Sequence, residues 1–359
     1  MGPIGRHRHL QAVERLRSSY AAIPAGAQVR LAKKTSNLFR PRAEPTAPGL
    51  DVSGLGGVIE IDPVARTADV QGMCTYEHLV EVTLEHGLMP LVVPQLRTIT
   101  LGGAVTGLGI ESTSFRNGLP HESVLEMEVF TGAGEVVTAT ATNEHARLFE
   151  TFPNSYGSLG YATRLRIELE PLAPLVSLRH VRFHDVALLA KTVAEVTETR
   201  EYDGRRVDGM DGVVFAPGEA YLTLATWTEL AEAGVSTSLA GARGSTAGMV
   251  SDHTGDAIFF RSIQQRETDL LTGYDYLWRW DTDWFWCSGA FGLQNPNIRR
   301  FWPRRWRRSD VYHRLVGLDT RFGIVDKLDR RAGRPQRERV VQDVEVAGET
   351  LEEGLVRFG

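Results

Sequence analysis

Residues 100–112 read TLGGAVTGLGIES, and this stretch decides how the rest of the chain is interpreted. Four glycines fall within eight positions, at Gly102, Gly103, Gly107 and Gly109, and a lone acid, Glu111, follows them. Glycine costs conformational entropy, so such a cluster marks positive φ angles or the close approach of another group. The first question is what approaches this segment.

The segment lacks the common nucleotide and nucleophile motifs. No lysine follows its glycines as the Walker A pattern requires, and Ser112 stands where G-x-G-x-x-G needs its third glycine. The sequence also contains no G-x-S-x-G elbow. What remains is a loop whose unobstructed backbone N–H groups can bind an anion, phosphate above all. The alternative is a tight turn packed on a neighbouring strand, and the second glycine pair, Gly157 and Gly160, favours the binding loop.

Composition bounds the class of protein. The chain has 359 residues, 42% hydrophobic and 24% charged, as in a globular protein, and its net charge of −5 argues against a nucleic-acid partner. Cys74 and Cys287 support neither a disulfide framework nor a four-ligand zinc site, and no metal site is expected. No apolar run reaches the roughly 18 residues of a spanning helix, and the N-terminus lacks the apolar core of a secretory signal. These features favour a cytoplasmic protein.

Periodicity predicts the elements of the first half. Apolar Leu10, Val13, Leu16 and Tyr20 predict a short amphipathic helix within residues 9–20, which either packs on the first domain or contacts a membrane. Strands, helices and one hairpin follow: strands at 29–34, 57–62, 67–72 and 161–169, helices at 75–87 and 144–152, and a hairpin at 123–141.

A domain boundary is expected at EPLAPL, where Pro171 and Pro174 interrupt the pattern. Beyond it, a strand at 176–183, a helix at 186–201 and a hairpin at 210–228 have the β-α-β-β order of half a ferredoxin-like sheet. A long aromatic and basic insertion precedes a last strand at 339–346 and a helix at 349–359. Because no further strands follow, we expect this second domain to be incomplete at its C-terminal end. The expected division is 1–24, 25–172 and 175–359.

The order of motifs over residues 28–172 resembles the FAD-binding (PCMH-type) domain of the vanillyl-alcohol-oxidase-type flavoproteins. The resemblance is carried by DVSGLGGVIEID at 51–62, PQLRTITLGGAVTGLGIES at 94–112 and LFETFPNSYGSLGYATRLRIEL at 148–169. It implies an α+β fold: a two-subdomain FAD-binding domain followed by a ferredoxin-like substrate cap. It also implies that FAD lies against three segments, which comprise Thr35, Ser36 and Asn37; Thr100, Leu101, Gly102, Gly103, Ala104, Val105, Thr106, Gly107, Leu108, Gly109, Ile110, Glu111 and Ser112; and Gly160, Tyr161 and Ala162.

One departure from the family concerns attachment of the flavin. Members with covalent flavin usually carry a histidine within a GGGHS-like first loop, whereas residues 32–40 read AKKTSNLFR. The resemblance therefore implies noncovalent FAD.

Within the family the sequence is most similar to the delta-24 sterol reductases. The similarity rests on RLAKKTSNLFR at 30–40, GLGIESTSFRNGL at 107–119, DTDWFW at 281–286, QNPNIRRFW at 294–302 and VVQD at 340–343. It implies an enzyme that takes hydride from NADPH and passes it from flavin N5 to an isolated C=C bond in the aliphatic tail of a sterol- or isoprenoid-like substrate. An FAD-linked oxidase of an alcohol or sugar, and an inactive flavin-binding protein with an incomplete cap, are the alternatives.

Four residues are candidates for catalysis. Glu111 is the acid nearest the glycines and can donate a proton or bond to the flavin, or it caps a surface loop. In the cap, Tyr276, Arg279 and Asp283 can supply polar groups to an apolar cavity walled by the neighbouring tryptophans. Alternatively, those tryptophans form the core of the cap.

The segment from Trp278 to Arg308 concentrates aromatic and basic residues. It holds six of the seven tryptophans, and six arginines fall in its last ten positions. Tryptophan and arginine together suit a membrane interface, so peripheral contact through this segment is one interpretation and a solvated basic helix end is the other. The expected partners are an apolar small molecule and a membrane surface, with no nucleic acid.

Overall fold

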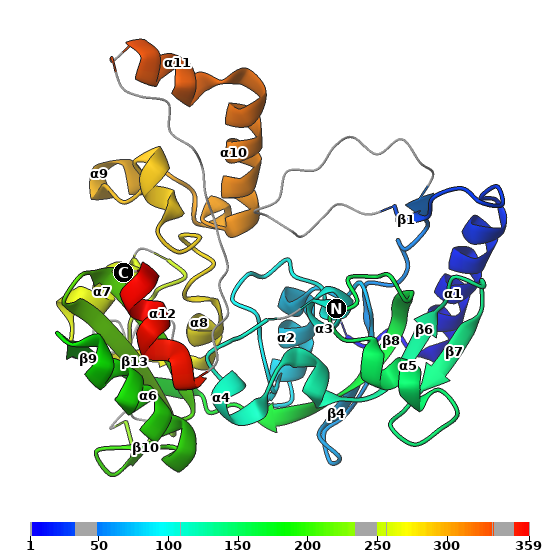
Figure 1. Cartoon of the computed structure of the whole chain (residues 1–359), viewed down its shortest axis with the longest axis horizontal. Coiled ribbons are helices and arrows are strands. Elements are labelled where there is room, and N and C mark those ends of the chain that lie inside the picture. Colours follow the sequence, from blue (N-terminus) through cyan, green and yellow to red (C-terminus); the bar gives the residue numbers. More distant parts are fainter. Residues whose placement is uncertain are drawn as a thin grey trace. The chain divides into compact units, whose positions relative to one another are not determined.

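The structure, a computed structural model, describes residues 2–32, 49–107, 109–233, 250–255, 257–331, 333 and 348–358. The chain divides into two compact units at the junction of Pro174 and Leu175, with residues 227–229 assigned to the first (Figure 1). Each unit combines a sheet with helices, so the predicted α+β class is confirmed.

Unit 1 contains five α-helices, a short 3₁₀ helix and eight strands in its described part. The helices are α1 (Arg6–Ala21), α2 (Tyr76–Leu84), α3 (Leu101–Thr106), α4 (Ser114–Asn117), η1 (Pro120–Ser123) and α5 (Ala146–Thr151). The strands are β1 (Arg30–Leu31), β2 (Gly49–Leu50), β3 (Val58–Asp62), β4 (Thr67–Gln71), β5 (Leu88–Pro90), β6 (Val124–Phe130), β7 (Val136–Ala139) and β8 (Tyr161–Pro171).

The sheets of unit 1 are organised around β8. Its main sheet has the order β3-β4-β8-β6-β7, with β5 paired to the far end of β8, and every pair is antiparallel. Strands β1 and β2 form a separate parallel pair. The predicted hairpin is confirmed as β6–β7, and the predicted helix at 75–87 as α2, whose first turn is capped by the Thr75 hydroxyl.

Helix α1 confirms the predicted N-terminal helix, but the face that it buries differs from the predicted one. Val13 and Leu16 are buried as expected, in a cluster with Leu50 and Phe130, but Leu10 is 62% exposed and His9 takes the buried position beside it. The hydropathy pattern missed this because a histidine was counted as polar. In the structure its imidazole has buried hydrogen-bond partners, which offset the cost of burial.

Unit 2 contains strands, α-helices and short 3₁₀ segments. The strands are β9 (Leu175–Phe183), β10 (Glu201–Tyr202), β11 (Arg205–Arg206), β12 (Gly209–Ala216), β13 (Glu219–Thr228) and β14 (Thr268–Thr272). The helices are α6 (Val186–Thr199), α7 (Phe259–Gln265), α8 (Gly273–Trp278), η3 (Cys287–Phe291), α9 (Pro296–Arg299), η4 (Arg304–Trp306), α10 (Ser309–Phe322), α11 (Ile324–Arg331), η5 (Gly348–Thr350) and α12 (Leu351–Phe358).

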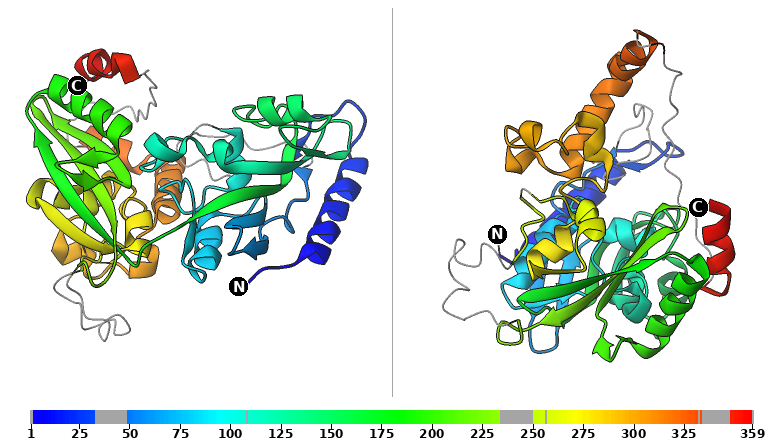
Figure 2. Two further views of the ribbon diagram at one scale, coloured as in Figure 1. Left: turned by 90° about the horizontal axis from the view of Figure 1, so that it is seen from below. Right: turned by 90° about the vertical axis from the view of Figure 1, so that its left-hand side faces the viewer.

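The sheet of unit 2 has four strands in the order β12-β13-β9-β14. Figure 2 shows α6 on one face of this sheet and the α7–α8 segment on the other. The β9-α6-β12-β13 prediction is confirmed, but the sequence analysis missed β14, which lies inside the supposed insertion and pairs antiparallel with β9. The strand predicted at 339–346 lies outside the described residues, and the helix predicted after it is α12.

The described residues hold neither a membrane span nor a metal-binding cluster. None of the helices among them is long and apolar enough to cross a bilayer. No group of three or more histidine, cysteine, aspartate or glutamate side chains in the same residues is placed to hold a metal ion.

Candidate functional site

The glycine segment begins with a helix, which the sequence analysis did not predict. Residues Leu101–Thr106 form α3, and the Thr100 hydroxyl caps it by accepting a hydrogen bond from the Gly103 amide at 3.3 Å. The amides of Leu101 and Gly102 donate to the carbonyls of Cys74 at 2.9 Å and Gly72 at 2.8 Å. The expectation of an open anion-binding loop over residues 101–106 is therefore wrong, because the protein itself uses these donors.

Close approach of another backbone explains Gly102. A Cβ atom at Gly102 would lie 2.7 Å from the Gly72 carbonyl oxygen, and one at Gly72 would collide with the Ala162 carbonyl. Neither glycine has a positive φ. The turn between β4 and α2 is therefore packed between α3 and the start of β8, and glycine is required where these three backbones meet.

Gly109, further along the segment, faces open space. A Cβ atom at Gly109 would have Pro120 as its nearest neighbour, at 3.9 Å, and φ at Gly109 is not positive. In the part of the chain that the structure describes, the amides of Gly109 and Ile110 donate to no protein acceptor. Ile110 is 68% exposed, and Gly103 is also exposed, on the same segment. We call Gly103, Gly107, Gly109 and Ile110 the glycine ledge.

The ledge is held by anchors after it as well as by α3 before it. The Thr113 hydroxyl donates to the Leu91 carbonyl at 2.8 Å, and the Glu111 amide donates to the Ser114 hydroxyl at 3.0 Å. Both Nη atoms of Arg116 lie 2.6 Å from the carboxylate oxygens of Glu170 on β8. A bidentate pair of this kind fixes geometry as well as adding energy. The backbone of the ledge is therefore fixed by its surroundings.

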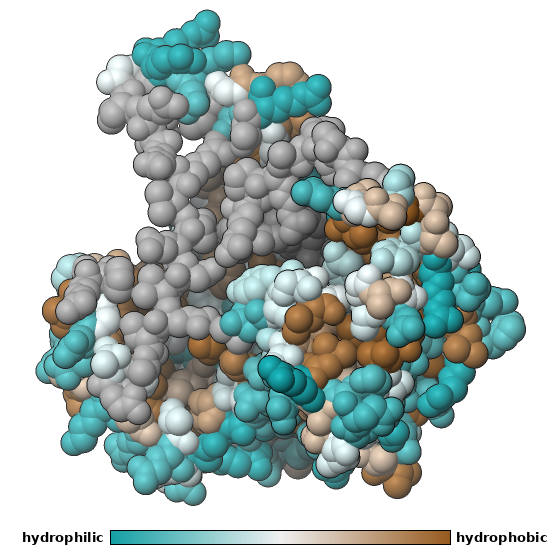
Figure 3. All heavy atoms as spheres, turned by 45° about the vertical axis from the view of Figure 1, so that its right-hand side comes forward, coloured by the Kyte–Doolittle hydropathy of each residue, from teal (hydrophilic) through white to brown (hydrophobic). Residues whose placement is uncertain are grey.

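The turn before β8 forms a second side of this site. The Tyr156 amide donates to the Thr106 carbonyl at 2.9 Å, so the turn lies directly against the end of α3. Tyr156 and Leu159 are exposed, and the buried Ser155 hydroxyl has no hydrogen-bond partner among the described residues. Figure 3, which brings the right-hand side of Figure 1 forward, shows apolar patches among hydrophilic surface on that face of the molecule. An uncovered apolar rim beside amides without acceptors is the chemistry of a ligand site.

Comparison with known proteins agrees with this geometry. The family described as FAD binding domain matches residues 16–140, which include the ledge. Over these residues the chain is similar to that family. The family model therefore covers the FAD-binding domain and not the whole protein.

The curated relatives fall into two groups. The Delta(24)-sterol reductase of Arabidopsis thaliana is 27% identical over 186 residues, which are 51% of this chain and 33% of that protein. That of Pisum sativum is 30% identical over 131 residues, 36% of this chain and 23% of that protein. Cytokinin dehydrogenase 5 of Arabidopsis thaliana is 34% identical over 142 residues, 40% of this chain and 25% of that protein. The matched region thus spans a third or less of each relative's length.

The glycine ledge carries hydrogen-bond donors that suit the phosphate and ring edges of FAD. The amides of Gly109 and Ile110 have no protein acceptor in the described part of the chain, and FAD carries the anionic oxygens that such amides bind. The other predicted FAD contacts are placed less directly. Thr35, Ser36, Asn37 and Leu108 lie outside the described residues, and Ala104 and Val105 are buried inside the FAD-binding domain.

The third predicted FAD segment, Gly160 to Ala162, has structural contacts of its own. Gly160 has φ of 134°, and a Cβ atom there would collide with the Phe130 carbonyl. Tyr161 and Ala162 pair with Phe130 and Val129 at the start of β8. These contacts explain the sequence of the turn without a ligand, and its contact with FAD remains a prediction.

Glu111 lies at the end of the ledge, half-buried. The Tyr76 side chain is fully buried nearby, and burial, followed by the charge of Glu111, raises the pKa of Tyr76 well above its ordinary value. Burial also raises the pKa of the Cys74 thiol to about 12, so this buried cysteine is a neutral thiol. A role for Glu111 in proton transfer or in bonding to the flavin remains a prediction.

The three catalytic candidates of unit 2 are buried among protein partners. Arg279 forms an ion pair with Asp211, donates to the Tyr276 carbonyl at 2.5 Å, and lies 3.9 Å from the centre of the Tyr276 ring. The Asp283 carboxylate lies 2.6 Å from Arg299. Burial raises the pKa of Asp283, and this effect outweighs the lowering by the charge of Arg299. The structure thus gives each of them a packing and pairing role, and a catalytic one remains a prediction.

The tryptophans of unit 2 separate into core and surface. Trp278, Trp280 and Trp284 are buried, with Trp280 edge-on to Phe259 at 4.9 Å between ring centres, so the core interpretation holds for these three. Trp286 is 65% exposed.

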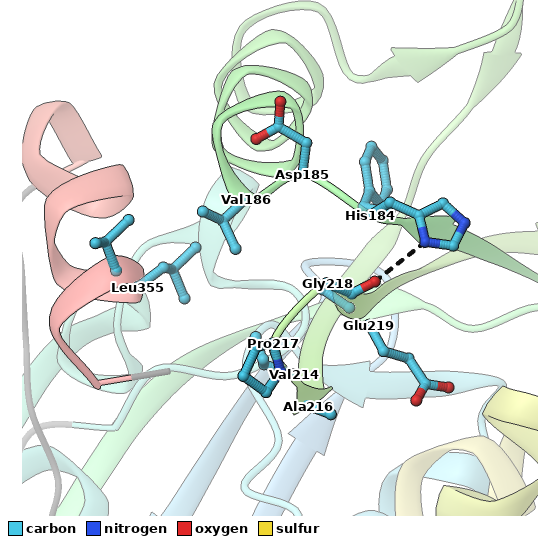
Figure 4. A pocket seen from close by; sticks show the side chains of 12 residues that line it. His184, Asp185, Val186, Val214, Ala216, Pro217, Gly218, Glu219 and Leu355 are labelled. Atoms are coloured by element: carbon cyan, nitrogen blue, oxygen red, sulfur yellow. Dashed lines mark hydrogen bonds between the residues drawn. The ribbon is translucent and has the colours of Figure 1, made fainter.

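A cavity of about 310 Å³ lies in unit 2, between α12, the start of α6 and the β12–β13 turn (Figure 4). Its polar side chains already have protein partners. Asp185 caps α6 through the Ala187 amide at 2.8 Å, and His184 Nδ1 lies 3.1 Å from the Gly218 carbonyl oxygen. Leu355 of α12 lines one side. Because the protein itself uses these polar groups, we give the cavity no chemical role.

Proposed function

We propose that this protein is an FAD-dependent oxidoreductase that reduces an isolated C=C bond of an apolar, sterol- or isoprenoid-like substrate, with NADPH as the electron donor. The observation that carries the proposal is the similarity to the sterol reductase of Arabidopsis thaliana, which extends over 186 residues, further than the FAD-binding domain itself. The matches to cytokinin dehydrogenases 10 and 5 are shorter, at 155 and 142 residues.

The glycine ledge, together with residues 35–37, would hold the cofactor in this proposal. Bound FAD supplies the hydride chemistry, and the protein supplies orientation and exclusion of water. The amides of Gly109 and Ile110 would bind its polar atoms, and Glu111 would hold or deliver a proton at the edge of the site. Noncovalent binding is supported by the absence of histidine from residues 32–40 and by the burial of Cys74.

Unit 2 is proposed as the substrate domain, and residues 25–172 as the complete cofactor domain after an N-terminal helix at 1–24. The four-stranded sheet with β14 in place supports a ferredoxin-like cap. Its residues Tyr276, Arg279 and Asp283 are proposed to shape that domain through their buried contacts.

A second candidate function is oxidation in place of reduction. Cytokinin dehydrogenase 5 is 34% identical to this chain over the matched residues, a higher identity than that of the sterol reductases. In this alternative the protein is an FAD-linked oxidase that uses oxygen on an alcohol or sugar. The two candidates differ in whether NADPH reduces the flavin.

The deciding experiment is an anaerobic visible spectrum of the purified protein before and after addition of NADPH. We expect flavin absorbance that moves to the supernatant after acid precipitation, and bleaching when NADPH is added. Flavin that NADPH leaves oxidised, but that an alcohol or sugar bleaches, would support the oxidase. Flavin that no reductant of either kind bleaches would support an inactive flavin-binding protein. A colourless protein that takes up no added FAD would overturn the assignment of the ledge.

A further inference from the structure

The segment from Trp286 to Arg308 in unit 2 has an unusual charge pattern. It contains six arginines and no acidic residue, in a protein whose net charge is −5. It runs through η3, α9 and η4, which are all short. We call it the arginine–aromatic segment.

Two of its arginines hold the segment from inside. Arg299 is buried, with Nη1 2.6 Å from Asp283 Oδ1. Arg307 is also buried and donates to the carbonyls of Gly255 at 2.6 Å and Trp302 at 3.0 Å. Buried arginines with this many partners fix the backbone around them. The backbone of the segment is therefore fixed by these contacts.

The outer side of the segment is covered by large apolar side chains. Phe301 is 77% exposed and Trp286 is 65% exposed, and Ile298 and Trp306 are exposed as well. They lie on one folded segment. Gln294 Nε2 donates to the Trp286 carbonyl at 3.0 Å, and Phe301 donates its amide to the Ile298 carbonyl at 3.1 Å. Exposed apolar side chains gathered in this way mark an interaction surface.

The remaining arginines surround these apolar side chains. Arg304 and Arg308 are paired with Asp252 and Asp310. Arg300 and Arg305 have no carboxylate within 4.0 Å in the described part of the chain. The Arg300 guanidinium lies 4.7 Å from the centre of the Phe301 ring, and that of Arg305 lies 5.8 Å from the centre of the Trp306 ring. Two of the exposed aromatic rings therefore carry a positive charge beside them.

We propose that the arginine–aromatic segment binds the surface of a membrane containing anionic phospholipids. Aromatic rings sit at the headgroup level of a bilayer, and guanidinium groups pair with lipid phosphate. Nucleic acid also carries phosphate, but binding to it would not bury the exposed apolar side chains of Ile298 and Phe301. The rest of the protein is acidic, which also disfavours nucleic acid. The contact is peripheral and stands independently of the proposed enzymatic function.

The charge part of the proposal is tested by sedimentation of the full-length protein with vesicles of phosphatidylcholine alone or mixed with phosphatidylserine. We expect binding to the mixed vesicles only. The double variant Arg300→Gln/Arg305→Gln should lower the partition coefficient about 30-fold, because each arginine at an anionic surface contributes about 1 kcal/mol and every 1.4 kcal/mol is a factor of ten. The matched control is Arg182→Gln, since Arg182 is also exposed in unit 2, above the Tyr221 ring.

The apolar part is tested with Phe301→Ser/Trp306→Ser against the control Leu188→Ser, which removes an exposed leucine from the same unit. We expect at least a tenfold loss of binding for the pair and none for the control, with unchanged circular dichroism. Brominated phosphatidylcholine in the mixed vesicles should quench tryptophan fluorescence of the wild type, and Trp286→Phe/Trp306→Phe should remove the quenching.

Three outcomes would overturn the proposal. These are equal binding to neutral vesicles, equal loss in the control variants, and binding of labelled duplex DNA with no binding of vesicles. Quenching that persists in Trp286→Phe/Trp306→Phe would also contradict it, because the membrane would then contact another part of the protein.

Discussion

His9 Nε2 lies 2.8 Å from Glu128 Oε2, joining α1 to β6 in the main sheet of the FAD-binding domain. The other ring nitrogen of His9 lies 3.3 Å from Gln71 Nε2, so both polar atoms of this buried ring have partners. Burial by itself raises the pKa of Glu128, but the hydrogen bond with His9 and the charge of Arg164 outweigh it and leave the pKa below its ordinary value. The carboxylate is therefore stabilised in the folded state.

The first prediction is that His9→Ala loosens α1. Removing the imidazole leaves buried Gln71 and Glu128 without this partner, which costs about 1–3 kcal/mol. Hydrogen exchange of peptides covering residues 6–21 should become faster, with no change over 186–199 in unit 2. The matched control is His7→Ala, since His7 is an exposed histidine of the same helix. Equal acceleration in both variants would mean that helix propensity, and not the His9 contact, controls α1.

The second prediction concerns Gly102 and Gly109, because substitution of the first should affect stability and substitution of the second should affect FAD binding. Gly102→Ala places a methyl group 2.7 Å from the Gly72 carbonyl oxygen, and overpacking of this kind costs about 1–3 kcal/mol. Gly109→Val meets its nearest atom only at 3.9 Å, so we expect an unchanged melting temperature. Because valine would occupy the space assigned to FAD, the dissociation constant for FAD should rise at least tenfold.

The control for the ledge is Gly132→Val, at another glycine of the same unit with open space around it and no positive φ. It should change neither the melting temperature nor the affinity for FAD, measured by flavin fluorescence. If Gly109→Val binds FAD as the wild type does, the cofactor lies elsewhere.

Local patterns predicted the elements that local interactions stabilise. The β6–β7 hairpin, α2 and α6 each carry their own signals: alternation around Gly134, a Thr75 cap, and an Asp185 cap. These need no distant partner, so the sequence alone specifies them.

The elements that were missed depend on distant contacts. Two adjacent glycines at 102 and 103 oppose a helix, yet α3 forms because Gly72 and Cys74 accept its first amides. Five residues from Thr268 to Thr272 are too short to be recognised within an aromatic insertion, and they form β14 because β9 lies beside them. The roles of the site residues could be predicted from the sequence only in part, since no sequence pattern shows that Gly102 faces the protein and Gly109 faces open space.

The third prediction separates pairing from catalysis at Arg279. Its partner Asp211 is largely buried, and removing one side of a buried ion pair typically costs about 3–5 kcal/mol. Arg279→Met should therefore lower the urea midpoint of unit 2, followed by fluorescence of the buried Trp278, Trp280 and Trp284. In the double variant Arg279→Met/Asp211→Leu the loss should be smaller than the sum of the two single losses. A stable Arg279→Met protein without turnover would instead support a catalytic arginine.

The last prediction concerns pH and His180 on β9. His180 is buried, its Nδ1 lies 2.8 Å from the Thr223 hydroxyl, and its Nε2 has no partner in the described residues. Burial lowers the pKa of His180 from 6.5 to about 4, against the opposing charge of Asp269. At pH values between these two pKa values, His180 is therefore protonated in the unfolded protein and neutral in the folded protein. Stability from this residue is complete above pH 6.5 and is lost as the pH falls toward 4, by up to about 3 kcal/mol.

The measurement is the urea midpoint of unit 2, from tryptophan fluorescence, at about pH 7.5 and about pH 5. His180→Gln should show a smaller difference between the two pH values than the wild type, because glutamine binds no proton. Asp269 has its own lowered pKa, set by burial opposed by hydrogen bonds from His253 and Ser251, and it titrates below this window. His184→Gln is the control, an exposed histidine beyond the end of β9. If His180→Gln retains the full pH dependence, another buried group of unit 2 binds the proton.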